Sequence, residues 1–129
     1  MMPDLATAES KAQEIRDRFP GMEPLCIFKA MPNVLIYSFA EVSQKTGETR
    51  DRIIASFNEP CDALSLYSAG HYIVVYNQLM PFVTVRKALA RELGHIVLGH
   101  DGTRPENVRN EEAQHFAMCL LDNKAGDTQ

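Results

Sequence analysis

The sequence predicts a single α+β domain, because helical and strand-like patterns occupy separate parts of one chain of domain size. The chain has 129 residues, which is about one domain's length and too short for two independent cores. Hydrophobic residues make up 45% of it and charged residues 23%, an ordinary globular composition that excludes a disordered or collagen-like chain. Helix-period segments flank a stretch in which two β-rich runs are joined by a glycine-containing break.

The N-terminal region predicts two helices. Over residues 4–19, apolar side chains recur at intervals of three and four, which is the period of an amphipathic helix. Asp4 is a suitable N-cap for this helix, and Pro20 with Gly21 predicts its end. A second, short helix is predicted over residues 23–30.

The middle of the chain predicts the strands. Residues 34–39 are rich in β-branched and aromatic residues, which favour a strand. Residues 40–57 are polar and mixed, and they predict one or two short helical turns. The runs 63–67 and 72–76 are β-rich on either side of the break at 68–71, which predicts a hairpin.

Two further helices are predicted in the C-terminal part. Apolar residues on helical spacing over 82–100 predict the first, and Gly99 predicts its exit. Thr103 and Glu106 match the Ser/Thr-x-x-Glu capping box, which predicts a last helix from there to about Leu121.

One domain is therefore expected over residues 1–122, followed by a flexible polar tail at 123–129. The N-terminus lacks a secretory signal and no apolar run reaches the roughly 18 to 20 residues of a membrane span, so a cytoplasmic location without membrane contact is expected. The net charge of −4 and the scattered Lys and Arg residues argue against direct nucleic-acid binding. Cys26, Cys61 and Cys119 are predicted to be reduced, partly buried thiols.

The segment with the clearest chemical meaning lies in the helix predicted over 82–100. There Glu92 and His95 stand as in the zinc-protease motif His-Glu-x-x-His, in which two imidazoles one turn apart hold a metal and the glutamate activates its bound water. Arg91 occupies the position of the first imidazole. A guanidinium has no lone pair for a metal, so Arg91 removes a ligand and adds a positive charge.

The region from about residue 60 to 121 resembles the ImmA/IrrE family of zinc metallopeptidases. Three pieces carry the resemblance: YIVVYN at 72–77, AxELGHxxLGH at 90–100 and EEAQHFA at 111–117. The resemblance implies a zincin-like fold, with a small antiparallel sheet of about three strands packed with N-terminal, active-site and C-terminal helices. It also implies that a glutamate of the last helix is the third metal ligand. Glu112 matches that position best, with Glu111 as the adjacent alternative.

Members of this family are commonly encoded by phages and mobile elements, and some cleave or inactivate a helix-turn-helix repressor. Because Arg91 replaces a ligand, we expect a degenerate member of the family with weak or no catalysis. We expect it to bind a protein partner, for example a phage or mobile-element repressor, and to hold zinc weakly or not at all. The alternative is an active zinc endopeptidase, with His95 and Glu112 as metal ligands and Glu92 as general base. An accessory, antitoxin-like partner is a third hypothesis.

Two residues of the motif helix are given structural roles by the sequence. Arg91 is long enough to place its guanidinium where the ion would lie, so it is predicted to act as a built-in cation paired with Glu112, Glu92 or both. Gly94 is predicted to let this helix approach a neighbour closely, since glycine otherwise costs a helix about 1 kcal/mol.

The other histidines are candidates for replacing the missing ligand. His100 lies five residues past His95, which on a helix points it about 140° away, so it is predicted to end the helix instead. Glu111, His115 and Cys119 share a helical stripe and form a plausible soft-metal set in isolation. The alternative is that His115 is a surface residue and Cys119 a packed thiol.

Overall fold

The computed structural model describes residues 1–49, 51–53, 62–100 and 103–127. The elements follow in the order α1 (Leu5–Arg18), α2 (Pro24–Ala30), β1 (Val34–Ser38), α3 (Phe39–Thr46), β2 (Ala63–Ser68), β3 (His71–Tyr76), α5 (Phe82–Val97) and α6 (Glu106–Asp127). The α+β class, the hairpin and the helix positions agree with the sequence prediction. The last part of the stretch predicted as helical turns, residues 54–57, lies outside the described residues, as do Cys61 and Gly102.

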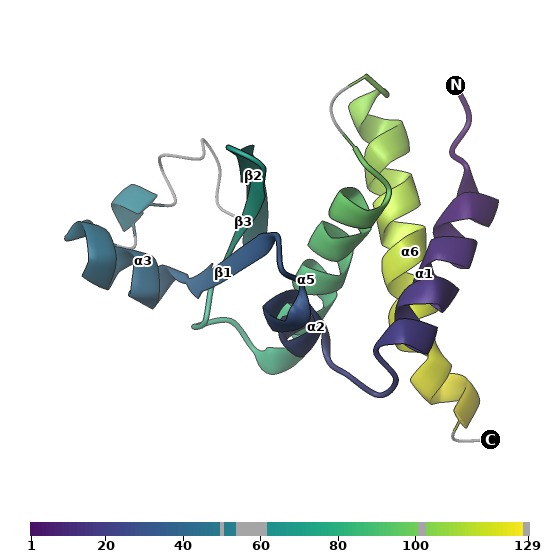
Figure 1. Cartoon of the computed structure of the whole chain (residues 1–129), viewed down its shortest axis with the longest axis horizontal. Helices are drawn as coiled ribbons and strands as arrows, with labels where there is room; N and C mark the ends of the chain where they lie inside the picture. Colours follow the sequence, from purple (N-terminus) through teal and green to yellow (C-terminus); the bar gives the residue numbers. More distant parts are fainter. Residues whose placement is uncertain (50, 54–61, 101–102, 128–129) are drawn as a thin grey trace.

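α5, α2, α6 and α1 lie on one side of the sheet, and α3 lies on the other (Figure 1). α5 contacts both the sheet and α6, and α1 packs against α6, while α2 lies against α5 and β1. The main core between these layers includes Ala8, Ala12, Phe28, Val74, Leu89, Leu93 and Phe116. Within the described ranges, no helix has the length and apolar character that crossing a bilayer would take.

The sheet is mixed, so the prediction of an antiparallel sheet is wrong for one of its pairings. In the described part of the chain three strands form it in the order β1-β3-β2. β2 and β3 are the predicted antiparallel hairpin, but β1 runs parallel to β3, with Val34 opposite Tyr72. A parallel pairing needs a long crossover, which the many residues between β1 and β3 supply. The other face of the sheet carries a smaller core of Phe39, Ile53 and Val75.

α1 begins as predicted at Asp4, whose carboxylate accepts a hydrogen bond from the Thr7 backbone N–H. The start of α6 differs from the prediction. Thr103 does not form a capping box, because α6 starts at Glu106. Pro105 explains the shift, since the residue before a proline is disfavoured in helical conformation and Arg104 therefore cannot open the helix. α6 extends to Asp127, beyond the predicted end at Leu121.

Gly94 brings α5 and α6 close together, as predicted. A Cβ atom on Gly94 would lie 3.0 Å from the Phe116 ring and 3.2 Å from the backbone of Ala113. Both contacts are tight, and Ala113 and Phe116 are fully buried. The close approach lets α6 present Glu112 to the end of α5.

We therefore expect Gly94→Ala to destabilise the protein by about 1 to 2 kcal/mol, because overpacking against α6 outweighs the helix propensity gained. Urea unfolding followed by circular dichroism measures this change in the free energy of unfolding. Lys87→Ala, on the exposed side of the same helix, is the control and should change it little. A Gly94→Ala variant as stable as the parent would contradict the tight packing.

Candidate functional site

After α5 the chain folds back over the last turn of this helix at Gly99 and His100. Gly99 adopts a left-handed conformation with φ of 68°, and its N–H donates to the Ile96 carbonyl. The N–H of His100 donates to the His95 carbonyl at 3.0 Å. These two bonds form a Schellman motif, which satisfies carbonyl groups at a helix end. His100 is therefore not on the helix, and the 140° helical offset predicted for it does not apply.

The folded-back His100 links the two predicted metal ligands. Its Nδ1 lies 2.8 Å from Nδ1 of His95, and its Nε2 lies 2.9 Å from Oε1 of Glu112. The His100 side chain is only 2% exposed. When His100 Nε2–H donates to the carboxylate and the ring is neutral, its Nδ1 accepts the proton of His95 Nδ1–H. His95 and Glu112 are thus connected through an imidazole.

Other donors hold the second carboxylate oxygen of Glu112. Oε2 accepts hydrogen bonds from Nη1 of Arg104 and from the backbone N–H of Asp4, both at 2.6 Å. Glu112 is buried, whereas Glu111 beside it is exposed. Of the two glutamates that the sequence left open, Glu112 is the one at the site.

Pro105 and Arg109 position Arg104 for this pairing. Because Arg104 precedes a proline, its backbone stays outside α6. Its carbonyl accepts a hydrogen bond from Nε of Arg109 at 3.0 Å. The Arg104 side chain is 38% exposed, so water shares in its solvation while its guanidinium contacts Glu112.

Glu92 is directed toward the sheet. Its Oε1 accepts a hydrogen bond from Oγ of Ser65 on β2 at 2.7 Å. Burial raises the pKa of Glu92, and the Ser65 hydrogen bond and the charge of Arg91 offset part of this rise. A carboxyl group with a raised pKa suits a general acid or base, the role predicted for Glu92.

The prediction that Arg91 is the built-in cation is wrong. Arg91 is exposed and lines a surface hollow together with Asp62, Lys87 and Gln114. No ion pair joins Arg91 to Glu112 or Glu92 in the described part of the chain; Arg104 pairs with Glu112 instead. A side chain at a helix surface can extend into solvent as well as inward, and Glu112 already has closer donors.

Burial and neighbouring charges shift the remaining pKa values. Burial is the main reason that the pKa of His95 falls to about 4, and electrostatic interaction with His100 and the charges of Arg109 and Arg91 lower it further. His95 is therefore neutral at pH 7. Burial alone would raise the pKa of Glu112, but the hydrogen bonds from Asp4 and His100 and the charge of Arg104 bring it below 4.5.

This arrangement of side chains does not fit a zinc ion at the predicted position. A catalytic zinc takes three protein ligands with free lone pairs. Here both carboxylate oxygens of Glu112 accept hydrogen bonds, one of them from a guanidinium, and Arg91 at the first-ligand position has no lone pair to give a metal. Throughout the residues that the structure describes, no buried side-chain nitrogen or oxygen lacks a hydrogen-bond partner that an ion could supply.

Sequence reasoning placed Glu92, His95 and Glu112 in one region but missed their partners Asp4, Ser65, His100 and Arg104. A signal existed for His100, because a glycine after a helix favours the Schellman turn. Pro105 was a weaker indication that Arg104 stays outside the last helix, where its side chain can reach Glu112. Nothing local marked Ser65 or the backbone N–H of Asp4, since both contact the site from distant parts of the chain.

We expect Glu112→Gln to lower the free energy of unfolding by about 1 to 3 kcal/mol, because the amide group loses the charge that Arg104 faces and turns an N–H₂ toward existing donors. The adjacent Glu111→Gln removes an exposed charge and should change stability by less than about 0.5 kcal/mol. Urea unfolding at neutral pH compares the two variants. Equal effects would show that the network around Glu112 adds no stability.

The low pKa of His95 makes stability depend on pH. Between pH 6.5 and about 4 the unfolded chain binds a proton at His95 that the folded chain excludes, so the free energy of unfolding falls as the pH is lowered through this window. The loss is on the order of 2 kcal/mol once partial exposure of the ring is allowed for. Below pH 4.5 the unfolded chain also takes up a proton at Glu112 that the folded chain excludes, which adds to the loss of stability.

Urea unfolding across this pH range tests the effect of His95. The slope should flatten in His95→Gln and persist in His71→Gln, in which the exposed histidine of the hairpin is removed. An unchanged slope in His95→Gln would contradict the assignment.

Comparisons with known proteins give this chain no relative. No family model matches it, and neither a curated protein nor a solved structure matches it. The resemblance to the ImmA/IrrE metallopeptidases therefore depends on the motifs at 72–77, 90–100 and 111–117, and membership of that family stays a prediction.

Proposed function

We propose that this protein is a non-catalytic binding module built like an ImmA/IrrE metallopeptidase, which holds an extended segment of a protein partner, such as a helix-turn-helix repressor, along β2. The observation that carries the proposal is the state of Glu112. Its carboxylate accepts hydrogen bonds from His100, Arg104 and Asp4, so the group expected to hold zinc serves to join parts of the fold.

The contacts of Glu92 and His95 also support a structural role for the motif helix. In a zinc peptidase this glutamate takes a proton from metal-bound water. Here its Oε1 accepts from Ser65, and the nearby His95 contacts His100. These contacts are consistent with a motif helix that has a structural role and does not catalyse a reaction.

β2 supplies the surface for a partner. It lies at an edge of the sheet, since the described strands have the order β1-β3-β2. Its sequence, ALSLYS, contains none of the charged residues or prolines with which proteins protect sheet edges from pairing. Leu66 and Tyr67 are 46% and 65% exposed, and the Tyr67 ring packs edge-on against Tyr72. An extended peptide can pair with such an edge through its backbone.

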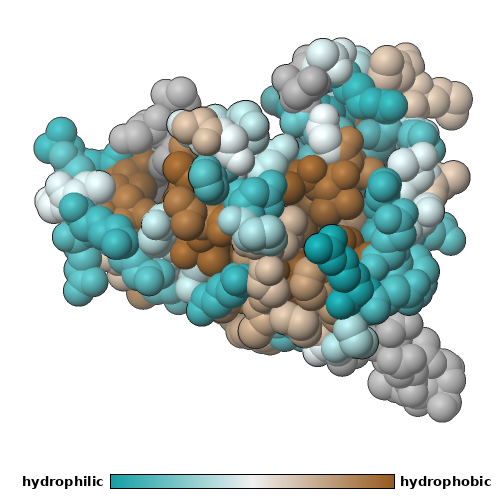
Figure 2. All heavy atoms as spheres, viewed as in Figure 1, coloured by the Kyte–Doolittle hydropathy of each residue, from teal (hydrophilic) through white to brown (hydrophobic). Residues whose placement is uncertain are grey.

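Apolar surface is exposed elsewhere as well. Figure 2 shows it over the sheet and over the helices on the face viewed, with polar side chains between these areas. Leu35 on β1 and Met118 on α6 are among the exposed apolar residues. Exposed apolar side chains alone do not identify β2, and β1 (VLIYS) is the other uncharged edge of the described sheet. β2 is distinguished by Ser65, whose hydroxyl contacts Glu92 on the motif helix.

The test uses the 129-residue chain and unstructured peptides selected for binding from a random displayed library. We expect bound peptide to protect backbone amides of Ala63–Ser68 from hydrogen exchange. Leu66→Lys, which places a charge at the strand edge, should weaken binding about tenfold, or about 1.4 kcal/mol. Met118→Lys introduces the same charge at an exposed apolar position on α6 and should leave the affinity unchanged.

Two results would overturn the proposal. Protection confined to other elements would place the binding surface elsewhere. Cleavage of the peptide after addition of zinc, lost in Glu92→Gln, would establish the alternative zinc endopeptidase. Sedimentation of the protein alone checks whether a second copy, rather than a peptide, pairs with β2.

A further inference from the structure

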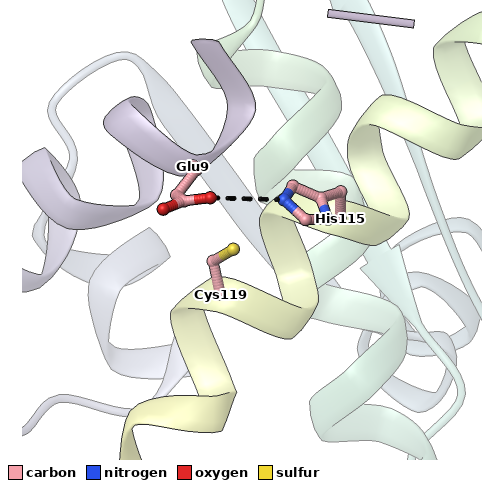
Figure 3. Close-up of side chains that lie close together, drawn as sticks. All are labelled: Glu9, His115 and Cys119. Atoms are coloured by element: carbon pink, nitrogen blue, oxygen red, sulfur yellow. Dashed lines mark ion pairs between the residues drawn. The ribbon is translucent and has the colours of Figure 1, made fainter. Parts of the chain in front are cut away.

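A second group of metal-ligating side chains lies away from the site around Glu112. Glu9 on α1 and His115 and Cys119 on α6 point toward one another (Figure 3), and one ligand atom from each lies within 4.8 Å of the other two. Nε2 of His115 is 3.7 Å from Oε2 of Glu9. His115 and Cys119 are partly buried, while Glu9 is exposed.

We propose that these three side chains form a binding site for Zn²⁺ or a similar borderline-soft divalent cation, which bridges α1 and α6. Thiolate, imidazole and carboxylate are all zinc ligands. In a tetrahedral site their ligand atoms lie roughly 3.3 to 3.8 Å apart. The 3.7 Å between Nε2 of His115 and Oε2 of Glu9 already lies in this range.

The packing of the two helices keeps these residues together. The spacing of four between His115 and Cys119 places them one turn apart on the same face of α6. α1 runs parallel to α6, as successive contacts show: Asp4 meets Glu112, Glu9 meets His115, and Arg16 donates to the Cys119 carbonyl. Ala8 and Ala12 of α1 and Ala117 of α6 are buried in the same core, and their small side chains suit a close approach of the two helices.

This set corrects the one found along the sequence. Glu111, His115 and Cys119 share a stripe, but eight residues of helix separate the first from the last by about 12 Å. One ion cannot contact side chains on three successive turns as closely as a tetrahedral site requires. Glu9 comes from the neighbouring helix at the level of His115, so it replaces Glu111 in the group.

The surroundings favour a cation over a catalytic thiol. Beside Cys119 lies a surface hollow of about 740 Å³, lined by Glu9, Glu14 and Asp17, with Arg16 as its basic residue. These side chains give it a net negative charge. Acyl transfer by a thiolate would need backbone donors for an oxyanion, and N–H groups in the middle of a helix are already bonded to carbonyls four residues earlier.

Cobalt(II) titration of the reduced 129-residue chain, after treatment with a chelator, tests the proposal. We expect one cobalt per chain and a thiolate-to-cobalt charge-transfer band that zinc displaces. Cys119→Ser should abolish the band, and His115→Gln and Glu9→Gln should each weaken cobalt binding about tenfold or more. All three changes lie at partly or fully exposed positions, and circular dichroism verifies that each variant is folded.

Matched controls separate this site from others. Cys26→Ser and Cys61→Ser remove the remaining thiols, Glu111→Gln removes an exposed carboxylate elsewhere on α6, and His95→Gln alters the motif helix. All four should retain the band and the affinity. Absence of a band in the parent protein, its survival in Cys119→Ser, or unchanged affinity in Glu9→Gln would overturn the proposal. Since none of these readouts involves β2 or Glu112, they do not depend on the proposed peptide binding.

Discussion

The buried carboxylate of Glu112 is the interaction on which the arrangement of the helices depends. It accepts hydrogen bonds from the start of α1 through Asp4, from the turn after α5 through His100, and from the residue before Pro105 through Arg104. A buried charge is costly unless it is paired and hydrogen-bonded, so these donors are required once α6 packs against α5. One side chain thereby joins the start of α1 to the connection between α5 and α6.

This use of Glu112 bears on the meaning of the His-Glu-x-x-His-like motif. In a metallopeptidase the carboxylate at this position faces a dication. In this chain a guanidinium and an imidazole provide the opposing donors, and they come from Arg104 and His100, not from Arg91. A network that is fully hydrogen-bonded stabilises one arrangement of side chains, whereas a metal site keeps lone pairs available. This contrast is the reason for proposing a binding module.

The contact between α1 and α6 has two consequences that can be separated experimentally. At one end, the backbone N–H of Asp4 supports Glu112. One to two turns farther along, the same parallel packing brings Glu9 beside His115 and Cys119. The first contact belongs to a buried network, while the second lies at the surface, where an ion can enter. Small buried side chains on α1, Ala8 and Ala12, suit this close packing.

The sequence by itself determined the features that depend on neighbouring residues. Helical period, the Asp4 cap, the β2–β3 hairpin and the close approach at Gly94 could be predicted, because each has a local pattern or a known conformational cost. Only the tertiary structure decided the parallel pairing of β1, the position of His100, the pairing of Arg104 with Glu112, and the place of Glu9 beside Cys119. The physical reason is that these contacts depend on the direction in which the chain leaves each turn. Period and composition do not encode that direction, and a single residue such as Gly99 or Pro105 can change it.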